Sequence, residues 1–265
     1  ERFAKALASG ADAVILDLED AVAPARKAHA RTAVAEFLAA RSADAATVFV
    51  RINPLDRGAA GDDLAAAAGA DGIVLPKAEG APSLRRLDAL LGERPAKILP
   101  IASETPAAVF ELGRYGGVTP RLCGLTWGAE DLPAAIGAAT SREADGRYTA
   151  PYEIVRALAL FGAHAAGVAA IDTVYPAIGD GAGLAAYAAR AARDGFAGML
   201  AIHPAQVEAI NRAFTPSQEA VAQARRVVAA FAAQPGAGAL QLDGRMLDAP
   251  HLAQAQRILT TAGER

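Results

Sequence analysis

The sequence predicts an α/β fold in which parallel strands form a (β/α)8 barrel. Seven short apolar runs of strand length alternate with alanine-rich helical segments between residues 13 and 202. Continuous apolar runs are typical of strands buried on both faces, and their alternation with helices indicates parallel pairing. A barrel of this kind needs eight strands and about 250 residues. The 265 residues of the chain are enough for one.

The seven predicted strands are rich in valine, isoleucine and leucine. They are Ala13–Leu18, Thr47–Ile52, Gly72–Pro76, Lys97–Ile101, Leu122–Trp127, Ala169–Thr173 and Gly198–Ile202. The helical segments between them are Pro24–Ala40, Gly61–Ala68, Ser83–Leu91, Pro106–Arg114, Pro151–Gly167 and Leu184–Asp194. A helical pattern over Arg2–Ala8 precedes the first run, so we expect the first barrel strand to lie upstream of, or to be missing from, this chain. An open doubly wound sheet, which tolerates seven strands, is the alternative.

The residues after the last strand predict an extension of the barrel and no second core. Helices are expected to begin near Pro204 and Pro216, and a final helix covers Pro250–Thr261. The stretch Gly236–Asp243 has the composition of a glycine-containing linker. We therefore expect a barrel domain over 1–235 and a C-terminal linker and helix over 236–265.

Composition and charge exclude several classes of protein. Hydrophobic residues at 53% and charged residues at 21% exclude a disordered chain, and a net charge of -3 argues against a nucleic-acid binder. Cys123 is the only cysteine, which excludes a disulfide framework and favours a reducing, cytoplasmic location. Apolar stretches such as Ala163–Ile171 are too short to span a bilayer, and we expect no signal peptide, because the first residues already have a helical pattern.

Polar side chains follow every predicted strand at its carboxyl end, where α/β barrels carry their catalytic groups. These residues are Asp17, Glu19, Asp20, Arg51, Asn53, Lys77, Glu104, Glu130, Asp131, Asp172 and His203. One or two polar residues would mean little in such loops. A charged residue after every strand is more than a solvated rim requires, so we expect the active site at this end of the barrel.

Glu104 and Asp131 are the candidate metal ligands, because each closely follows an apolar strand. Adjacent barrel strands would bring the two carboxylates to one point. Mg²⁺ is commonly held by one or two carboxylates, with water and substrate oxygens completing the octahedron. The alternative is that Glu104 caps the helix entered at Pro106, and that Asp131 caps a helix or pairs with a lysine.

Arg51 ends a strand that is otherwise apolar. Its guanidinium either pairs with an interior carboxylate, such as Asp17 or Glu19, or binds a carboxylate or carbonyl oxygen of a ligand. Asp17 and Glu19 share one face because neighbours on a strand alternate sides, so Asp20 cannot face the same way. Lys77 is a candidate structural partner for these carboxylates.

The histidines give weaker signals. His203 stands before Pro204, where it either is catalytic or makes a contact at the start of a helix. No two histidines have the His-x-x-x-His spacing, so a zinc hydrolase is unsupported. Cys123, inside a predicted strand, is expected to be a small buried apolar residue.

Seven short motifs stand at the strand ends in a fixed order. They are Asp17-Leu18-Glu19-Asp20-Ala21-Val22, Val50-Arg51-Ile52-Asn53, Leu75-Pro76-Lys77, Glu104-Thr105-Pro106, Gly128-Ala129-Glu130-Asp131-Leu132, Ala170-Ile171-Asp172-Thr173-Val174-Tyr175 and Ala201-Ile202-His203-Pro204-Ala205-Gln206. Together they resemble the citrate lyase β-subunit-like proteins of the HpcH/HpaI aldolase superfamily. Each motif is weak alone, but seven in order, in a match that runs from Phe3 to about Gln256, are highly specific.

The resemblance implies a (β/α)8 barrel that binds Mg²⁺ and cleaves or forms a carbon–carbon bond in a 3-hydroxyacyl-CoA. Family members include malyl-, citramalyl- and citryl-CoA lyases, which are oxo-acid lyases of the EC 4.1.3 type. The family's metal ligands fall on Glu104 and Asp131, and its substrate-binding arginine falls on Arg51. The products would be acetyl-CoA and a 2-oxo acid or oxaloacetate.

The segment Gly244–Pro250 resembles the lid of the CoA lyases, in which an aspartate reaches into a neighbouring subunit's site. That aspartate corresponds to Asp248, which would exchange a proton with the acetyl carbon. Family members with this lid are usually trimers or larger, so we expect a homotrimer or a dimer of trimers. The residues named above after the first and third strands, Asp17, Glu19, Asp20 and Lys77, are expected to bind substrate or to support the site.

The chain departs from the family pattern in two places: the Arg-Ser pair of the family's first strand is missing, and Met199 stands where many members have lysine. Both departures bear on substrate preference. Three alternatives stay open. They are a CoA-independent class II pyruvate aldolase of the same superfamily, the β subunit of a citrate lyase complex, and a catalytically silent binding paralogue.

Overall fold

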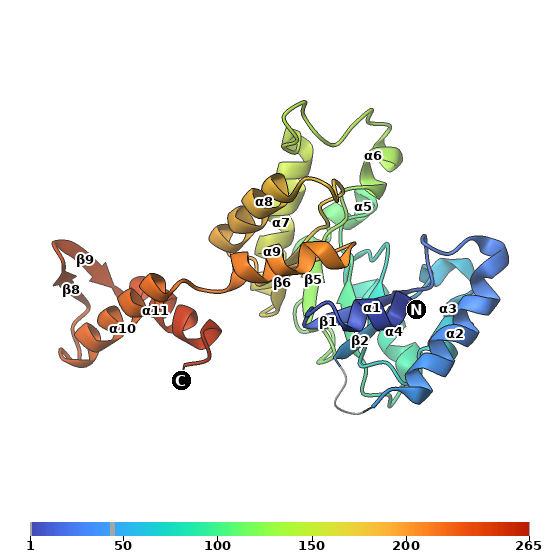
Figure 1. The fold of residues 1–265 in the computed structure, drawn as a ribbon, viewed down its shortest axis with the longest axis horizontal. Helices are drawn as coiled ribbons and strands as arrows, with labels where there is room; N and C mark the ends of the chain where they lie inside the picture. Colours follow the sequence, from blue (N-terminus) through green and yellow to red (C-terminus); the bar gives the residue numbers. More distant parts are fainter. Residues whose placement is uncertain (1, 43–45, 265) are drawn as a thin grey trace. The chain divides into compact units, whose positions relative to one another are not determined.

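Seven parallel strands follow one another along the first part of the chain in the computed structural model, which describes residues 2–42 and 46–264 (Figure 1). They are β1 (Ala13–Asp17), β2 (Thr47–Arg51), β3 (Gly72–Leu75), β4 (Lys97–Pro100), β5 (Gly124–Thr126), β6 (Ala169–Asp172) and β7 (Gly198–Met199). One sheet has the order β1-β2-β3-β4 and another the order β5-β6-β7. Parallel bridges Ile98–Leu122 and Ile101–Thr126 connect the two at β4 and β5.

Each of these strands therefore lies beside its sequence neighbour, as in the wall of a (β/α)8 barrel. An open doubly wound sheet would reverse its strand order, so that alternative is wrong. The α/β barrel class is confirmed, and all seven strands fall inside the predicted runs. Among the described residues, β7 and β1 are not paired with each other, and no further strand connects them.

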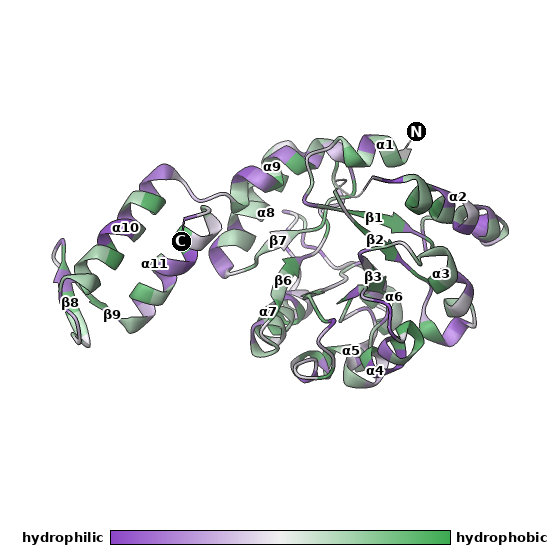
Figure 2. Ribbon diagram, turned by 90° about the horizontal axis from the view of Figure 1, so that it is seen from below, coloured by the Kyte–Doolittle hydropathy of each residue, from purple (hydrophilic) through white to green (hydrophobic). Residues whose placement is uncertain are grey.

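Helices surround the strands, as Figure 2 shows. They are α1 (Arg2–Leu7), α2 (Lys27–Ala40), α3 (Ala60–Ala66), α4 (Gly80–Leu91), α5 (Pro106–Val109), α6 (Asp131–Ile136), α7 (Ala150–Ala165) and α8 (Gly181–Asp194). Short 3-10 helices are η1 (Pro24–Arg26), η2 (Leu55–Arg57) and η3 (Leu112–Arg114). The sequence did not predict α6, because six residues with a proline in the first turn show no helical periodicity.

The interior of the strand layer is filled by side chains from several strands. Val74, Leu99 and Ile101 are buried together, with the partly buried side chains of three further residues packed against them: Phe49, Cys123 and Ile171. Contacts among residues of β2, β3, β4 and β6 require the wall to curve around a common interior. Cys123 is half-buried there, and its Sγ donates to the carbonyl of Ile98 at 3.3 Å.

The chain contains a second compact unit: one unit is Glu1–Ile210 and the other is Asn211–Arg265, with α9 (Pro204–Phe214) crossing the boundary. The second unit holds α10 (Gln218–Ala232), the antiparallel strands β8 (Ala239–Leu242) and β9 (Arg245–Asp248), and α11 (Ala249–Thr261). Its own core is formed by Ala224, Val227, Leu240, Leu247 and Ala255.

This division differs from the predicted one in where α10 belongs. The expected boundary between residues 235 and 236 lies inside the second unit, because α10 packs against α11 and β8. The expected linker Gly236–Asp243 includes a strand over its second half. Asp243 and Gly244 have φ of 51° and 76°, as a two-residue type I′ hairpin turn requires, and Asp-Gly is a strong sequence signal for that turn.

No helix within residues 2–42 and 46–264 has the length and apolar character that a membrane span needs.

Candidate active site

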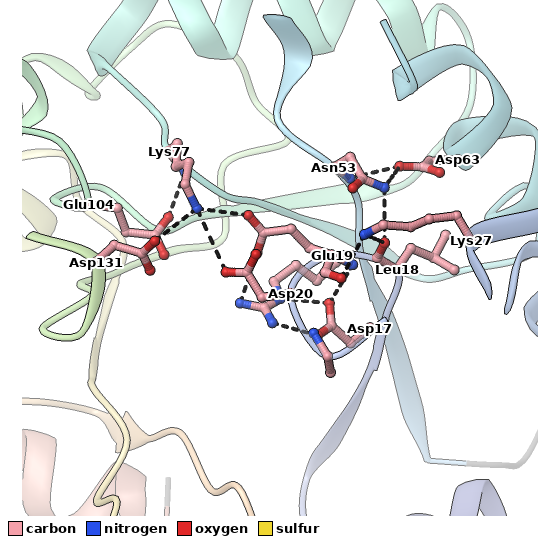
Figure 3. Close-up of polar contacts among 12 residues, drawn as sticks. Asp17, Leu18, Glu19, Asp20, Lys27, Asn53, Asp63, Lys77, Glu104 and Asp131 are labelled. Carbon is pink, nitrogen blue, oxygen red and sulfur yellow. Dashed lines mark hydrogen bonds and ion pairs between the residues drawn. The ribbon is translucent and has the colours of Figure 1, made fainter. Parts of the chain in front are cut away.

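The charged residues at and after the carboxyl ends of β1 to β5 form one connected network. Figure 3 shows the carboxylates of Asp17, Glu19, Asp20, Glu104 and Asp131 arranged around basic side chains. Parallel strands bring their carboxyl ends to the same edge, which is why residues far apart in the sequence meet here. The prediction that these residues come together is thereby fulfilled.

Arg51 forms the first half of the network. Its Nε and Nη2 donate to Asp17 Oδ1 and Oδ2 at 2.8 and 2.5 Å, and its Nη1 lies 3.1 Å from Glu19 Oε2. Asp17 and Arg51 are register partners on β1 and β2, so the sheet fixes this pair. Burial raises the pKa of Asp17, but the hydrogen bonds and charge of Arg51 outweigh it and hold that pKa below its ordinary value. Arg51 keeps 23% of its side chain exposed, so it also remains open to a ligand.

Lys77 forms the link to the second half. Its Nζ lies 2.9 Å from Glu19 Oε1, 3.1 Å from Asp131 Oδ1 and 3.8 Å from Asp20 Oδ2, and its backbone N–H donates to Glu104 Oε2 at 2.6 Å. Burial lowers the pKa of Lys77, but the surrounding carboxylates raise it by a larger amount. The pKa is therefore above its ordinary value, and the ammonium stays charged. Lys77 thus pairs with carboxylates as predicted.

Glu104 and Asp131 form the second half. Glu104 is buried, and burial raises its pKa to about 8, with the charges of Asp131 and Glu19 adding to the effect. Thr105, rather than Glu104, caps α5, because its Oγ1 accepts the N–H of Ala108 at 3.2 Å. The capping alternative for Glu104 is therefore wrong, whereas Asp131 does pair with a lysine, Lys77.

The Glu104–Asp131 pair fits a hard divalent cation. Within the described residues, no group of three or more histidine, cysteine, aspartate or glutamate side chains is arranged to hold a metal. Two carboxylates suffice for Mg²⁺, which keeps several water or substrate ligands. A buried carboxylate whose pKa is raised by a second carboxylate is stabilised as an anion when a cation binds to both. The donor set and its electrostatics therefore suit Mg²⁺.

Gly128, two residues after the end of β5, makes room for Glu104. A Cβ atom at Gly128 would lie 2.7 Å from Glu104 Cγ and 3.2 Å from Oε1. The Gly128 N–H donates to Ser103 Oγ at 3.1 Å, which fixes this loop against the residue that precedes Glu104. This role of Gly128 was not predicted, although the residue lies between an apolar strand and a candidate ligand.

The variant Gly128→Ala is expected to weaken Mg²⁺ binding by about 10–100-fold, the usual effect of displacing a metal ligand through a neighbouring group. The added methyl group overlaps the Glu104 side chain and displaces it from its present position. Titration calorimetry with Mg²⁺ measures the effect. Gly61→Ala is the matched control, because a Cβ at Gly61 meets no atom within 4 Å. Wild-type affinity in Gly128→Ala would contradict the placement of Glu104 as a ligand.

Asp172 and His203 have structural contacts. Asp172 is fully buried, and its Oδ2 accepts from Arg156 Nε and Nη2 at 2.9 and 2.7 Å, while its Oδ1 accepts from Trp127 Nε1 at 2.7 Å. These bonds hold Trp127 and with it the loop that carries Gly128. His203 accepts the N–H of Ala205 at 3.2 Å on Nδ1, which is the helix-start contact considered for it.

Asn53 and Asp63 stabilise the loop after β1. Asn53 Nδ2 donates to the Leu18 carbonyl at 2.9 Å and to Asp63 Oδ2 at 2.7 Å, and Asp63 is fully buried. Figure 3 shows Lys27 beside this group, where its Nζ donates to the carbonyls of Leu18 and Glu19. Asp63 was not predicted from the sequence, because it lies in a helix ten residues after Asn53 and away from any strand end.

Asp248 belongs to the second unit, where it is the N-cap of α11. Its side chain accepts from the backbone N–H of His251, and the His251 side chain accepts from the backbone N–H of Asp248 in a capping box. His251 Nδ1 also lies 2.5 Å from Asp248 Oδ1. The carboxyl group is 41% exposed. Neither the cap nor the contact with His251 was predicted.

Known proteins resemble the chain along its whole length. The model of the family described as HpcH/HpaI aldolase/citrate lyase matches residues 2–204. A citrate lyase subunit beta-like protein of Mycobacterium tuberculosis is 40% identical over 266 residues, covering 100% of this chain and 92% of that protein. An L-malyl-CoA/beta-methylmalyl-CoA lyase of Cereibacter sphaeroides is 32% identical over 292 residues, covering 98% of this chain and 90% of that protein.

A solved structure gives the same relationship in three dimensions. It is the crystal structure of the protein CitE from Mycobacterium tuberculosis in complex with magnesium, acetoacetate and coenzyme A. Its TM-score to this chain is 0.85 at 38% sequence identity, covering 99% of this chain and 94% of that one.

Proposed function

The chain belongs to the HpcH/HpaI aldolase/citrate lyase family, and from this premise we propose that it is a Mg²⁺-dependent carbon–carbon lyase acting on a coenzyme A thioester. The substrate is a 3-hydroxyacyl-CoA of the malyl-, citramalyl- or citryl-CoA type. The products are acetyl-CoA and a 2-oxo acid or oxaloacetate. One observation carries this proposal: Glu104 and Asp131 both contact Lys77, and Glu19 connects Lys77 to the guanidinium of Arg51.

Glu104 and Asp131 would hold the Mg²⁺ ion. The ion supplies a Lewis acid for the substrate oxygen that becomes the keto group. The two carboxylates would fix the position of the ion at the carboxyl ends of β4 and β5. The magnesium in the related CitE structure supports the choice of metal.

Arg51 supplies positive charge for the acyl end of the substrate. When the carbon–carbon bond breaks, negative charge develops on the thioester oxygen, and a preorganised guanidinium stabilises it. Asp17 fixes the plane of that guanidinium through two hydrogen bonds, and Glu19 holds its third nitrogen. Asp20, with 63% of its side chain exposed, lies at the rim, where it can contact substrate.

Asp248 is proposed as the proton donor to the acetyl carbon in cleavage, and as the base that removes that proton in condensation. The lid-like segment 244–250 and the exposed carboxyl group support this role. We further propose that Asp248 acts in the site of a neighbouring subunit, so that the working form is a homotrimer or a dimer of trimers. His251, in the first turn of α11, lies beside this carboxyl group.

The proposed reaction is tested by incubating the chain with malyl-CoA, citramalyl-CoA and citryl-CoA, with Mg²⁺ and with EDTA, and measuring acetyl-CoA, free CoA and the oxo acid. We expect one thioester to give equal amounts of acetyl-CoA and oxo acid, with no activity in EDTA. Free CoA without acetyl-CoA would instead indicate thioester hydrolysis and would contradict the lyase reaction.

Other outcomes identify the alternatives. Cleavage of free 4-hydroxy-2-oxo acids but of no thioester would indicate a CoA-independent pyruvate aldolase. Cleavage only of an acyl-carrier-protein thioester, with two other subunit types co-purifying, would indicate a citrate lyase β subunit. Mg²⁺ binding with no cleavage of any substrate would indicate a silent paralogue.

A further inference from the structure

We propose that Lys77 is a positioning residue that couples the two halves of the site. Through its backbone it holds Glu104, and through its ammonium group it holds Asp131 and Glu19 together. Its positive charge therefore lowers the affinity of Glu104 and Asp131 for a cation. The same charge helps to neutralise Glu19, so that more of the Arg51 charge can act on an anionic ligand. This inference rests on the proposed function only in taking Glu104 and Asp131 as the cation ligands.

The backbone of Lys77 is in an unusual conformation. Its φ of 50° lies in the left-handed region, which residues other than glycine rarely occupy. With the backbone turned in this way, the N–H of Lys77 points to Glu104 Oε2 at 2.6 Å. Glycine would adopt this φ at lower cost, so the presence of a lysine indicates that its side chain is required here.

The ammonium group of Lys77 is shared between the two halves. Glu19, from the loop after β1, lies 2.9 Å from Nζ, and Asp131, from the start of α6, lies 3.1 Å from it. Figure 3 shows Nζ between these side chains. An ammonium group suits this place because it is a compact charge with three donors, whereas a guanidinium presents its donors in one plane.

Glu19 contacts both Lys77 and Arg51, so the charge of Lys77 affects how much of the Arg51 charge Glu19 neutralises. The Glu19 side chain is only 3% exposed, so its negative charge must be balanced by neighbours. It has two cationic partners, Lys77 at 2.9 Å and Arg51 at 3.1 Å. Its Oε2 finds no hydrogen-bond donor of good geometry among the described residues, so its contact with Arg51 is purely electrostatic. Without Lys77, Arg51 alone would balance both Glu19 and Asp17.

The two halves should therefore respond to the loss of Lys77 in opposite directions. On the cation side, Asp131 loses an ammonium at 3.1 Å, so the ligand pair becomes more negative and binds a divalent cation more tightly. On the arginine side, more of the guanidinium charge is neutralised by Glu19, so an anion binds more weakly. A residue that only supported the local fold would weaken both.

The test is the variant Lys77→Met, which keeps the length of the side chain and removes its charge. Calorimetric titration of the protein alone is expected to show Mg²⁺ binding tighter by about tenfold. In saturating Mg²⁺, the same variant is expected to bind pyruvate about 3–10-fold more weakly. Lys77→Gln gives a second neutral variant, and circular dichroism verifies that both are folded.

Two controls accompany these variants. Lys77→Arg retains the positive charge through which the coupling acts, so Mg²⁺ affinity should stay within about threefold of the wild type, even though the planar guanidinium cannot reproduce every contact of the ammonium. Lys97→Met removes the same charge from an exposed residue at the amino end of β4, far from the carboxyl ends, and should change neither affinity.

Mg²⁺ binding that is weaker in both neutral variants, or equal to that of the wild type, would overturn the coupling role of Lys77. So would pyruvate binding that is unchanged or stronger. A wild-type chain that binds no Mg²⁺ would overturn it together with the ligand pair. If no thioester is cleaved but the two affinities still move in opposite directions, the proposed reaction fails and the coupling by Lys77 stands.

Discussion

Replacing Glu104 by glutamine is expected to abolish measurable Mg²⁺ binding and to lower kcat about a thousandfold or more, which corresponds to the several kcal/mol that a Lewis-acid metal contributes. Glutamine has the same size and still accepts the N–H of Lys77, so the loop keeps its main contact. Only the charge of the ligand is lost. Calorimetric titration gives the Mg²⁺ affinity, and steady-state kinetics with the cleaved thioester gives kcat.

The pH dependence of wild-type Mg²⁺ binding provides an independent check on Glu104. Burial raises the pKa of Glu104 to about 8, and a carboxyl group must lose its proton to bind a metal ion. Mg²⁺ affinity should therefore rise by up to about tenfold per pH unit as the pH increases towards 8, and then level off. The free energy of unfolding without Mg²⁺ should instead fall as the pH increases. The raised pKa contributes stability that is fully present below the ordinary pKa of 4.5 and is lost as the pH rises through about 8.

The variant Asp131→Asn is the control for this pH effect. The charge of Asp131 helps to raise the pKa of Glu104, so its removal should move the rise in affinity to lower pH while weakening binding overall. A wild-type affinity that does not change between pH 6 and pH 8 would contradict the buried, proton-holding state of Glu104.

The barrel and most of its site could be predicted because both follow from local signals. Each apolar run is a strand, and the residue after it lies at the common carboxyl edge, so Asp17, Arg51, Lys77, Glu104 and Asp131 could be brought together without knowing a single contact. The Asp243-Gly244 turn was also present in the sequence as a hairpin signal, although its flanking strands were not recognised.

The contacts that hold the site residues in position could not be predicted, because they join residues far apart in the sequence. The N–H of Lys77 meets Glu104 across 27 positions in the chain, and the space beside Gly128 is occupied by a side chain 24 residues earlier, Glu104. No periodicity or spacing rule encodes a left-handed lysine or a missing Cβ. Sequence patterns place the reacting groups, whereas long-range packing sets their charge and orientation.

Replacing Asp248 by asparagine is expected to lower the rate of thioester cleavage by about 10²–10⁴-fold, the usual contribution of a general acid or base. Mg²⁺ affinity and stability should be unchanged. Asparagine caps helices as well as aspartate does, so α11 keeps its N-cap while the ionisable group is lost. Acetyl-CoA release measures the rate, calorimetry the Mg²⁺ affinity, and thermal unfolding the stability.

The structural alternative for Asp248 is that it only caps α11, and Ser217→Ala is the matched control for that alternative. Ser217 caps α10 by accepting the N–H of Ala220 at 3.1 Å. Its loss should cost about 1 kcal/mol of stability and leave the rate of cleavage unchanged. Full activity in Asp248→Asn would leave Asp248 with the cap alone and would refute its catalytic role.

Mixing two inactive variants tests whether Asp248 acts across a subunit boundary. Asp248→Asn has an intact cation site, and Glu104→Gln has an intact lid aspartate. Suppose that the lid of one subunit completes the site of the next. In random mixed trimers, a given site then has an intact cation site with a chance of about one half and an intact lid with a chance of about one half, so about a quarter of the sites are complete. Co-expression should then restore about a quarter of the wild-type activity, whereas an Asp248 that serves its own subunit would restore none.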